Sequence, residues 1–178
     1  MKILEFLKKI LKMGCMQMKQ KKVWILSGVP GSGKSTWARN RVAQFGGTIC
    51  SRDEIRFSLL KDGEDYFSHE DEVWALLIEK ITTAITNPEV NDIYVDATHL
   101  TEKAREKLFK ELPKDVCFIT TVFFDVPLET CIERNDNRSG RAFVPHSVIR
   151  RMYASYERDT KLGDATLHLD KNGEWRGI

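Results

Sequence analysis

A glycine-rich segment carries the clearest chemistry in the sequence. Residues 28–36 read Gly-Val-Pro-Gly-Ser-Gly-Lys-Ser-Thr, which satisfies the Walker A spacing G-x-x-x-x-G-K-[ST]. Glycines at these positions let successive backbone N–H groups turn inward and bind an anion. We expect Lys34 to reach the β- and γ-phosphates of a nucleoside triphosphate and Ser35 to place its hydroxyl on Mg²⁺. The predicted nucleotide-binding residues of this loop are Gly28, Pro30, Gly31, Ser32, Gly33, Lys34, Ser35 and Thr36.

A second group of charged side chains lies in residues 51–56, Ser-Arg-Asp-Glu-Ile-Arg. If a helix begins at Asp53, then Asp53 and Arg56 share one helix face at i and i+3. The carboxylate could then accept the proton of an attacking hydroxyl, while the guanidinium binds an anionic acceptor. The same spacing is common at the charged start of a capped helix. The pattern alone leaves both alternatives open.

A long polar loop, residues 135–144, contains the third candidate group. Arg138 and Arg141 flank the dipeptide Ser139-Gly140 in this loop. A mobile arginine that closes over a triphosphate neutralises charge in the transition state of phosphoryl transfer. Long polar loops in compact domains are often functional lids, but loop arginines that contact only solvent are the commoner case.

The elements that must position these residues follow from the hydrophobic pattern. Short apolar runs alternate with longer amphipathic segments, which is typical of an α/β protein with a parallel sheet. Strands are predicted at residues 23–27, 48–50, 92–96, 116–124 and 166–169. Helices are predicted at residues 34–45, 53–60, 68–86, 101–111, 128–134 and 145–158, with Ser68 as the N-cap of the third.

The predicted fold is a P-loop NTPase-type, three-layer α/β/α arrangement with a central parallel sheet and a helical or loop lid. Open parallel sheets bind their ligands at the carboxyl ends of the strands. The glycine-rich loop, Asp53 and Asp96 each follow or close a predicted strand. We therefore expect them to gather at one edge of the sheet.

Length and composition fit one soluble globular domain of 178 residues. The formal net charge of +2 hides an asymmetry, because residues 1–22 carry seven lysines against one glutamate, a net +6. The remainder of the chain therefore sums to −4. A folded domain that gripped long nucleic acid through its phosphates would usually be basic. Any nucleic-acid contact must then be local.

Residues 1–21 are predicted to be a basic amphipathic extension, and residues 22–178 the catalytic domain. The extension is expected to be dispensable, to pack against another surface or copy, or to anchor at a surface. It contains no secretory signal, and no apolar run is long enough to span a membrane. The four scattered cysteines are typical of free thiols in a cytoplasmic protein. Oligomeric state has no signature in the sequence.

Three stretches together closely resemble the 5′-kinase domain of phage-type polynucleotide kinases. They are residues 28–39, residues 51–56 and residues 124–153, in order and at similar spacing across residues 22–158. The last stretch is more specific than the Walker A match. The resemblance implies transfer of the γ-phosphate of ATP, or another nucleoside triphosphate, to the 5′-hydroxyl end of DNA or RNA with Mg²⁺, in nucleic-acid repair.

The resemblance also implies individual roles. Lys34 and Ser35 match the family's phosphate and metal contacts, and Asp53 matches its general base. Arg138 matches the lid arginine over the donor phosphates. The remaining expected contacts are Arg134 to the nucleotide and Arg56, Asp96 and Thr98 to the acceptor, with Arg56 matching the contact to the acceptor's 3′-phosphate.

The chain departs from the family at several points. Ala97 stands where the phage member has an acidic residue, and the nearby carboxylate is Asp96, which is expected in the outer shell of Mg²⁺ or beside Arg56. His99 stands where asparagine is frequent, and its expected role is a loop hydrogen bond. The phosphatase module that follows in the phage enzyme is expected to be absent.

Two other function classes remain compatible with the sequence. A P-loop kinase of a small molecule, such as a nucleoside, nucleotide or sugar, shares the loop and the early aspartate. A regulatory module that binds nucleotide without phosphoryl transfer fits the loop alone, but leaves Asp53, Arg56 and Arg138 without a role.

Overall fold

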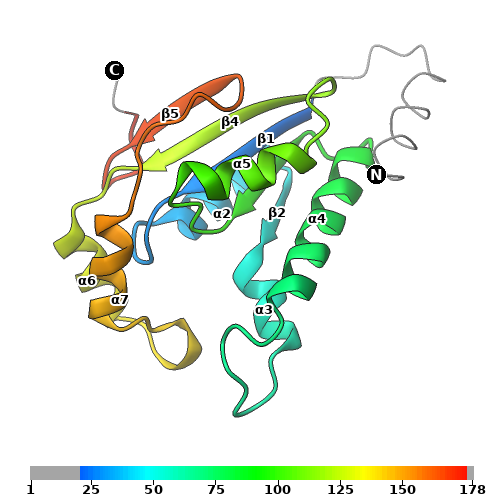
Figure 1. Ribbon diagram of the computed structural model, residues 1–178. Coiled ribbons are helices and arrows are strands. Elements are labelled where there is room, and N and C mark those ends of the chain that lie inside the picture. The colour runs from blue at the N-terminus through cyan, green and yellow to red at the C-terminus, as the bar shows by residue number, and fades with distance from the viewer. Residues whose placement is uncertain (1–20, 176–178) are drawn as a thin grey trace.

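The central feature of the computed structural model, which describes residues 21–175, is one parallel sheet of five strands. The strand order is β2-β3-β1-β4-β5 (Figure 1). The strands are β1 Lys21–Ser27, β2 Thr48–Ser51, β3 Asp92–Asp96, β4 Cys117–Phe124 and β5 Ala165–Leu169. The strand that leads into the glycine-rich loop therefore lies in the middle of the sheet. The predicted extension falls outside the described residues, except for Lys21.

Helices cover both faces of this sheet. They are α2 Lys34–Phe45, α3 Arg52–Leu59, α4 Glu70–Thr86, α5 Glu102–Glu111, α6 Leu128–Asp136 and α7 His146–Ala154. Side chains of a strand point alternately to opposite faces. Val23 and Ile25 of β1 accordingly pack with α4 and α5, whereas Leu26 packs with α2, α6 and α7. The three-layer prediction is confirmed.

The start of α4 differs from its predicted position. The helix begins at Glu70, and its N-cap residue is His69, whose side chain makes no capping hydrogen bond. The Ser68 hydroxyl instead donates to the carbonyl of Asp65 at 2.9 Å. The prediction of Ser68 as N-cap is therefore wrong, because this hydroxyl stabilises the preceding loop.

The last helix is shorter than predicted. α7 ends at Ala154, because the chain turns back toward the sheet. The buried Tyr156 donates its hydroxyl to the Ser27 carbonyl at 2.5 Å, and the Glu157 N–H donates to the Leu100 carbonyl at 2.9 Å. These contacts fasten the segment after α7 to the carboxyl edge of β1.

The carboxyl ends of β1, β2 and β3 are in register. Asp96 of β3 pairs with Leu26 of β1 on one side and with Ser51 of β2 on the other. Because all strands run in parallel, the glycine-rich loop, the start of α3 and the segment after Asp96 leave the same edge of the sheet. The fold thus gathers the predicted site residues as expected.

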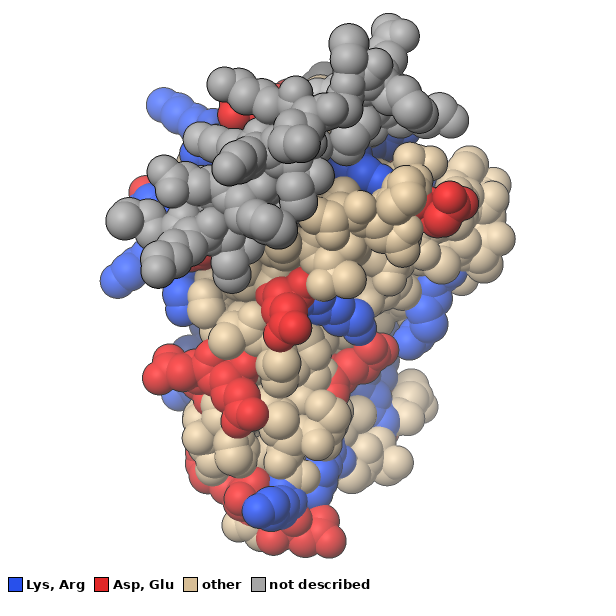
Figure 2. Space-filling model, turned by 90° about the vertical axis from the view of Figure 1, so that its right-hand side faces the viewer, with Lys and Arg blue, Asp and Glu red and all other residues tan. Residues whose placement is uncertain are grey.

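Thiols and surface charge give no further constraint on function. Cys50, Cys117 and Cys131 are buried and free, and no helix within residues 21–175 is long and apolar enough to cross a membrane. On the face shown in Figure 2, the described acidic and basic side chains are intermixed. That face offers no continuous basic surface among its described residues, in agreement with a local grip on any nucleic acid.

Candidate active site

The glycine-rich loop packs closely against α6. Gly31 has φ +83°, and a Cβ atom there would lie 2.1 Å from the Cys131 carbonyl oxygen. A Cβ on Gly28 would meet the Ser32 hydroxyl oxygen at 2.7 Å. At Gly31 only glycine fits, because a Cβ would collide with the backbone of α6 and the φ angle is left-handed. This position therefore sets how closely the loop approaches α6.

The loop ends at an uncapped helix N-terminus. Gly33, the N-cap of α2, has φ +96° and no side chain to bond the free N–H groups of the first turn. Ser35 lies in this turn, half-buried, while Thr36 is exposed. Pro30 is half-buried at the outer bend of the loop. Unpaired N–H groups and the positive end of the helix dipole form a site for a phosphate chain.

Lys34 supplies the fixed charge of this loop. Its ammonium is buried, and it donates to the Val29 carbonyl at 2.9 Å and to the Ser32 hydroxyl at 3.4 Å. Burial lowers the pKa of Lys34, while the negative charges of Asp96 and Asp53 oppose that shift. A bound triphosphate would supply the counter-charge that the buried ammonium lacks.

Asp53 and Arg56 meet as predicted, and two further residues join them. Arg56 Nη1 donates to Asp53 Oδ1 at 2.7 Å and to the Tyr66 hydroxyl at 2.8 Å. The Tyr66 hydroxyl donates to the same Asp53 oxygen at 2.8 Å. Glu70 accepts from Arg56 Nε at 3.1 Å and from Nη2. The arginine is therefore held from two sides.

This cluster combines a buried cation with an open carboxylate. Arg56 is only 4% exposed, whereas the Asp53 side chain is 61% exposed. Burial alone acts to lower the pKa of Arg56, but the hydrogen bond to Glu70 and the negative charges of Glu70 and Asp53 raise it overall. The guanidinium stays charged, and the carboxylate stays accessible to an acceptor.

The segment after β3 contacts the glycine-rich loop. Asp96 is buried at the strand end, close enough for its charge to act on Lys34. The Thr98 carbonyl accepts a hydrogen bond from the Gly28 N–H at 2.9 Å. Thr98 therefore joins the two loops through its backbone, and the sequence did not indicate that contact.

The two predicted lid arginines behave differently. Arg138 is exposed just beyond α6, and its charge acts on Lys34. Arg141 instead forms an ion pair with Asp62 at 2.9 Å and donates to the Leu60 carbonyl at 3.4 Å. The polar loop, which contains the short 3-10 helix Gly140–Ala142, is thus tied to the segment between α3 and α4.

Arg134 lies beside the glycine-rich loop. Its Nη1 atom is 3.6 Å from the position that a Cβ on Gly33 would take, and its Nη2 donates to the Lys171 carbonyl at 2.7 Å. The structure thus brings Arg134 next to the loop that the sequence assigned to nucleotide. Its role there stays a prediction.

A buried arginine that the sequence analysis missed holds the edge together. Arg105 of α5 is 1% exposed and donates to the carbonyls of His99 at 2.9 Å, Glu157 at 3.0 Å and Asp159 at 2.8 Å. It also lies over the Phe123 ring, 5.1 Å from the centroid. Its three carbonyl partners come from two separate segments, so no local spacing signals this role.

His99 makes the loop hydrogen bond expected for it. Its Nδ1 lies 3.0 Å from the Leu26 carbonyl, and the residue is 5% exposed with φ +40°. Burial lowers the pKa of His99 to about 4, a shift that its hydrogen bond to the Leu26 carbonyl partly opposes. The folded protein therefore keeps a neutral imidazole whose Nδ1–H donates to Leu26.

Acid is expected to weaken the fold through His99. The unfolded chain takes up this proton as the pH falls through about 6.5, whereas the folded protein does so only near pH 4. The free energy of unfolding should therefore fall from pH 6.5 to pH 4, by up to about 1.4 kcal/mol per pH unit. Urea unfolding at several pH values measures this slope. The variant His99→Asn keeps a donor and tolerates positive φ, so it should show a shallower slope. Equal slopes would contradict the assignment.

Tyr66 and Glu70 are the functional candidates that the sequence analysis missed. Glu70 belongs to an acidic run at the start of α4, which suggested only a helix terminus. Tyr66 lies in a loop without periodicity. No signal in the sequence identified Glu70, because the burial of Arg56 that calls for a second carboxylate becomes apparent only in the fold.

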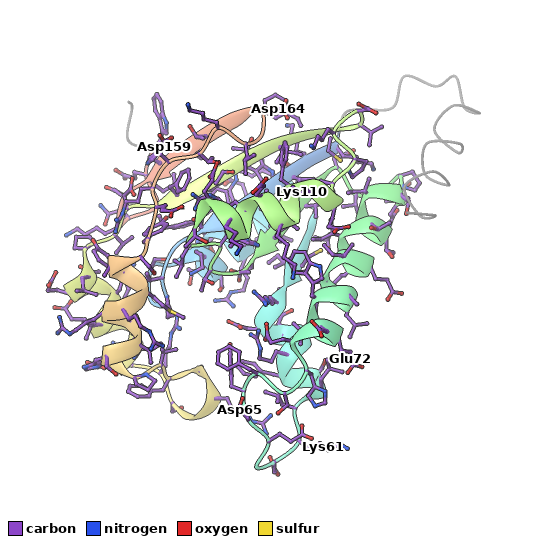
Figure 3. All side chains as sticks on the ribbon, in the orientation of Figure 1. Lys61, Asp65, Glu72, Lys110, Asp159 and Asp164 are labelled. Atoms are coloured by element: carbon purple, nitrogen blue, oxygen red, sulfur yellow. The ribbon has the colours of Figure 1, made fainter. Side chains whose placement is uncertain are left out.

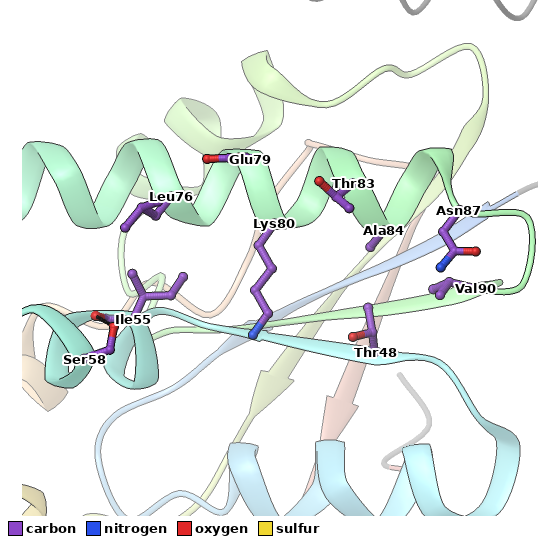
Figure 4. Close-up of a pocket in the computed structure, with 10 residues that line it drawn as sticks. All are labelled: Thr48, Ile55, Ser58, Leu76, Glu79, Lys80, Thr83, Ala84, Asn87 and Val90. Atoms are coloured by element: carbon purple, nitrogen blue, oxygen red, sulfur yellow. Dashed lines mark hydrogen bonds between the residues drawn. The ribbon is translucent and has the colours of Figure 1, made fainter.

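A cavity in the described part of the chain lies away from this edge. It measures about 460 Å³ and lies between α4 and the β2–α3 segment, with Lys80 extending across it from α4 (Figure 4). Its lining residues are Thr48, Ile55, Ser58, Leu76, Glu79, Lys80, Thr83, Ala84, Asn87 and Val90. None of the predicted site residues lines it.

Comparison with known proteins gives a family and a set of relatives. The profile of a family described as AAA domain matches residues 23–158. A curated protein of Autographa californica nuclear polyhedrosis virus, named as a bifunctional polynucleotide kinase/RNA ligase, is 27% identical over 150 residues. That match covers 76% of this chain and 21% of the viral protein. The chain thus spans about a fifth of that relative.

Solved structures share the fold. A chain in a structure titled as the Pnkp1/Rnl/Hen1 RNA repair complex has a TM-score of 0.66 and 24% identity, over 76% of this chain and 44% of that one. A sugar kinase from Janibacter sp. HTCC2649 has a TM-score of 0.61 and 21% identity, over 86% of both chains. A gluconokinase from Sinorhizobium meliloti 1021 has a TM-score of 0.54 and 21% identity, over 87% of this chain and 84% of that one. The fold is therefore that of P-loop kinases.

Proposed function

The chain belongs to the AAA-domain family and is a P-loop kinase, and we propose that it transfers the γ-phosphate of ATP to the 5′-hydroxyl of a polynucleotide. The phosphate donor is a nucleoside triphosphate, as the family implies. The proposed acceptor is inferred from Asp53 and Arg56, which lie at the carboxyl edge of the sheet. The viral relative, named for polynucleotide kinase and RNA ligase, supports the same acceptor.

The hydrogen-bonded pair of Asp53 and Arg56 carries the proposal. The exposed Asp53 carboxylate can accept the proton of a hydroxyl as it attacks the γ-phosphate. Arg56 uses four of its five N–H donors on Asp53, Tyr66 and Glu70 among the described residues, so one Nη2 hydrogen remains for an anion. A hydroxyl with a phosphate one sugar away matches this pair, and the 5′ end of a polynucleotide has that arrangement.

The glycine-rich loop and the lid arginine would act on the donor. Lys34 and the N–H groups of the first turn of α2 bind the β- and γ-phosphates, and Arg138 neutralises charge on the transferring group. Lys34 is already buried and fixed by hydrogen bonds, so little reorganisation accompanies the reaction. Arg134, which lies beside Gly33, would also bind the nucleotide.

The residues present fit Mg²⁺ bound mainly by phosphates and water. Within residues 21–175, no cluster of three or more His, Cys, Asp or Glu side chains could hold a metal alone. Mg²⁺ commonly keeps several waters and takes one or two protein ligands plus substrate phosphates. The Ser35 hydroxyl would supply such a ligand. The buried Asp96 carboxylate, whose charge acts on Lys34, would orient a water bound to the ion. When bound, the ion neutralises charge on the donor phosphates.

A sugar kinase is the second candidate. The sugar kinase and gluconokinase structures match over most of their own length, whereas the repair-complex chain matches over 44% of its length. A sugar acid would also present a hydroxyl and an anionic group to Asp53 and Arg56. The two candidates differ in the distance and chemistry of that anion.

Acceptor specificity tests the proposal. We expect kcat/KM to rise from a free nucleoside to a nucleoside 3′-phosphate and again to a 5′-hydroxyl oligonucleotide. The first rise is expected because only the nucleoside 3′-phosphate offers Arg56 a phosphate to bind. Arg56→Lys removes the planar fork and should reduce the preference for the 3′-phosphate by about tenfold. A higher kcat/KM for gluconate or a neutral sugar than for the oligonucleotide would favour the sugar kinase.

A further inference from the structure

Three aromatic side chains form a connected cluster beside the proposed acceptor site. Phe57 of α3 and Tyr66 of the following loop pack edge to face with centroids 6.3 Å apart. Tyr66 and Phe67 do the same at 5.0 Å. We call Phe57, Tyr66 and Phe67 the aromatic cluster. Phe57 lies on α3, whereas Tyr66 and Phe67 lie on the segment between α3 and α4, where Figure 3 labels Lys61 and Asp65.

Two members of the aromatic cluster remain in water. Tyr66 is 38% exposed and Phe67 is 64% exposed. A scattered exposed ring needs no explanation, but neighbouring exposed rings often mark a binding surface. Phe67 has no hydrogen-bonding side-chain atom, so its exposure serves no polar contact.

The aromatic cluster is joined directly to the groups that would meet the acceptor. The Tyr66 hydroxyl donates to Asp53 at 2.8 Å and accepts from Arg56 at 2.8 Å. The guanidinium carbon of Arg56 lies 4.3 Å from the centre of the Tyr66 ring. An acceptor bound by Asp53 and Arg56 would therefore lie beside Tyr66, which contacts both residues.

A small cavity adjoins two of these rings, Phe57 and Tyr66. It measures about 190 Å³ and is lined by Phe57, Tyr66, Lys61 and Arg141, together with Leu60, Gly63 and Glu64. The flat apolar walls of Phe57 and Tyr66 suit a planar ring. Of the two cations, Arg141 is already paired with Asp62 at 2.9 Å. Glu64 is already engaged by the Lys61 N–H at 2.9 Å and by His69 at 3.1 Å.

We propose that the aromatic cluster is a stacking subsite for the nucleobase at the 5′ end of the acceptor. This inference rests on the proposed function, because it assigns the base that follows the hydroxyl and phosphate held by Asp53 and Arg56. Stacking on aromatic side chains tolerates any base sequence, because every base has a π-face. The subsite therefore selects for a nucleobase without reading its identity, and a sugar without a base loses this contact.

The test compares two oligonucleotides in equilibrium binding to the full chain. One carries a natural base at its 5′-hydroxyl end, and the other has an abasic sugar at that position. A non-hydrolysable ATP analogue with Mg²⁺ occupies the donor site, so that affinity is measured without turnover. The variants are Phe67→Ala and, as a control, Phe45→Ala. Phe45 is similarly exposed, at 54%, but ends α2 away from the loop.

Wild-type protein should bind the natural end about tenfold or more tightly than the abasic end. Phe67→Ala should lose most of this difference, while Phe45→Ala keeps it and both variants bind the ATP analogue normally. An undiminished preference in Phe67→Ala, or equal binding of both ends by wild type, would overturn the subsite. Phosphorylation of the natural oligonucleotide is measured in parallel. Its absence would count against the proposed function, whereas the binding ratio tests the subsite.

Discussion

Replacing Asp53 by asparagine is expected to reduce phosphoryl transfer to the acceptor by about 10²- to 10⁴-fold. The amide keeps the size of the side chain but cannot take the hydroxyl proton. Nucleotide binding should persist, because Asp53 is 61% exposed and lies outside the glycine-rich loop. The measurement pairs steady-state rates with the affinity for ATP, so that loss of chemistry is separated from loss of binding.

The matched control for this variant is Glu54→Gln. Glu54 occupies the same first turn of α3 and is exposed, and its backbone N–H donates to the Ser51 hydroxyl. Its carboxylate makes no hydrogen bond or ion pair with residues 21–175. Its rate should stay close to wild type. If Asp53→Asn retained full activity, or if Glu54→Gln lost as much, the role of Asp53 as base would be wrong.

Replacing Lys34 by methionine is expected to lower kcat by at least about 10²-fold. The ammonium is the fixed charge of the glycine-rich loop, and methionine fills its space without charge. Because burial lowers the pKa of Lys34, the charged form costs stability in the free protein. The melting temperature without nucleotide should therefore stay the same or rise, while the increase on adding ATP and Mg²⁺ should disappear.

An exposed lysine provides the control for Lys34→Met. Lys103→Met removes a charge from the first turn of α5, where the residue is exposed. It should leave both kcat and the nucleotide-induced rise in melting temperature unchanged. A Lys34→Met protein that unfolds at lower temperature and still responds to ATP would contradict the assigned role.

Local patterns were sufficient to predict most of the fold. The continuous apolar run of β1 indicates a strand that is buried on both faces, and the helical periodicity of α4 indicates a helix that is buried on one face. The glycine-rich loop was predictable because its backbone conformation demands glycine at Gly31 and Gly33. Asp53 and Arg56 were predictable as a pair, because residues three positions apart on a helix lie on the same face.

Contacts between distant segments were not predictable. Arg56 binds Glu70 across a loop that has no periodic pattern, and Arg105 bonds the Glu157 carbonyl 52 residues away. Such contacts depend on how α3, α4 and α5 pack, and the spacing of single residues does not encode that packing. The predicted end of α7 was wrong for the same reason. Tyr156 lies beyond the helix, where its hydroxyl donates to the Ser27 carbonyl.

If the P-loop, Asp53 and Arg56 together phosphorylate a polynucleotide 5′ end, the protein should discriminate between two kinds of oligonucleotide end. The protein is incubated with γ-labelled ATP, Mg²⁺ and a pair of oligonucleotides that differ only in a 5′-hydroxyl or a 5′-phosphate. We expect label on the 5′-hydroxyl oligonucleotide alone, and loss of that label in Asp53→Asn. Absence of label on that oligonucleotide, with active transfer to a sugar under the same conditions, would contradict the proposed function.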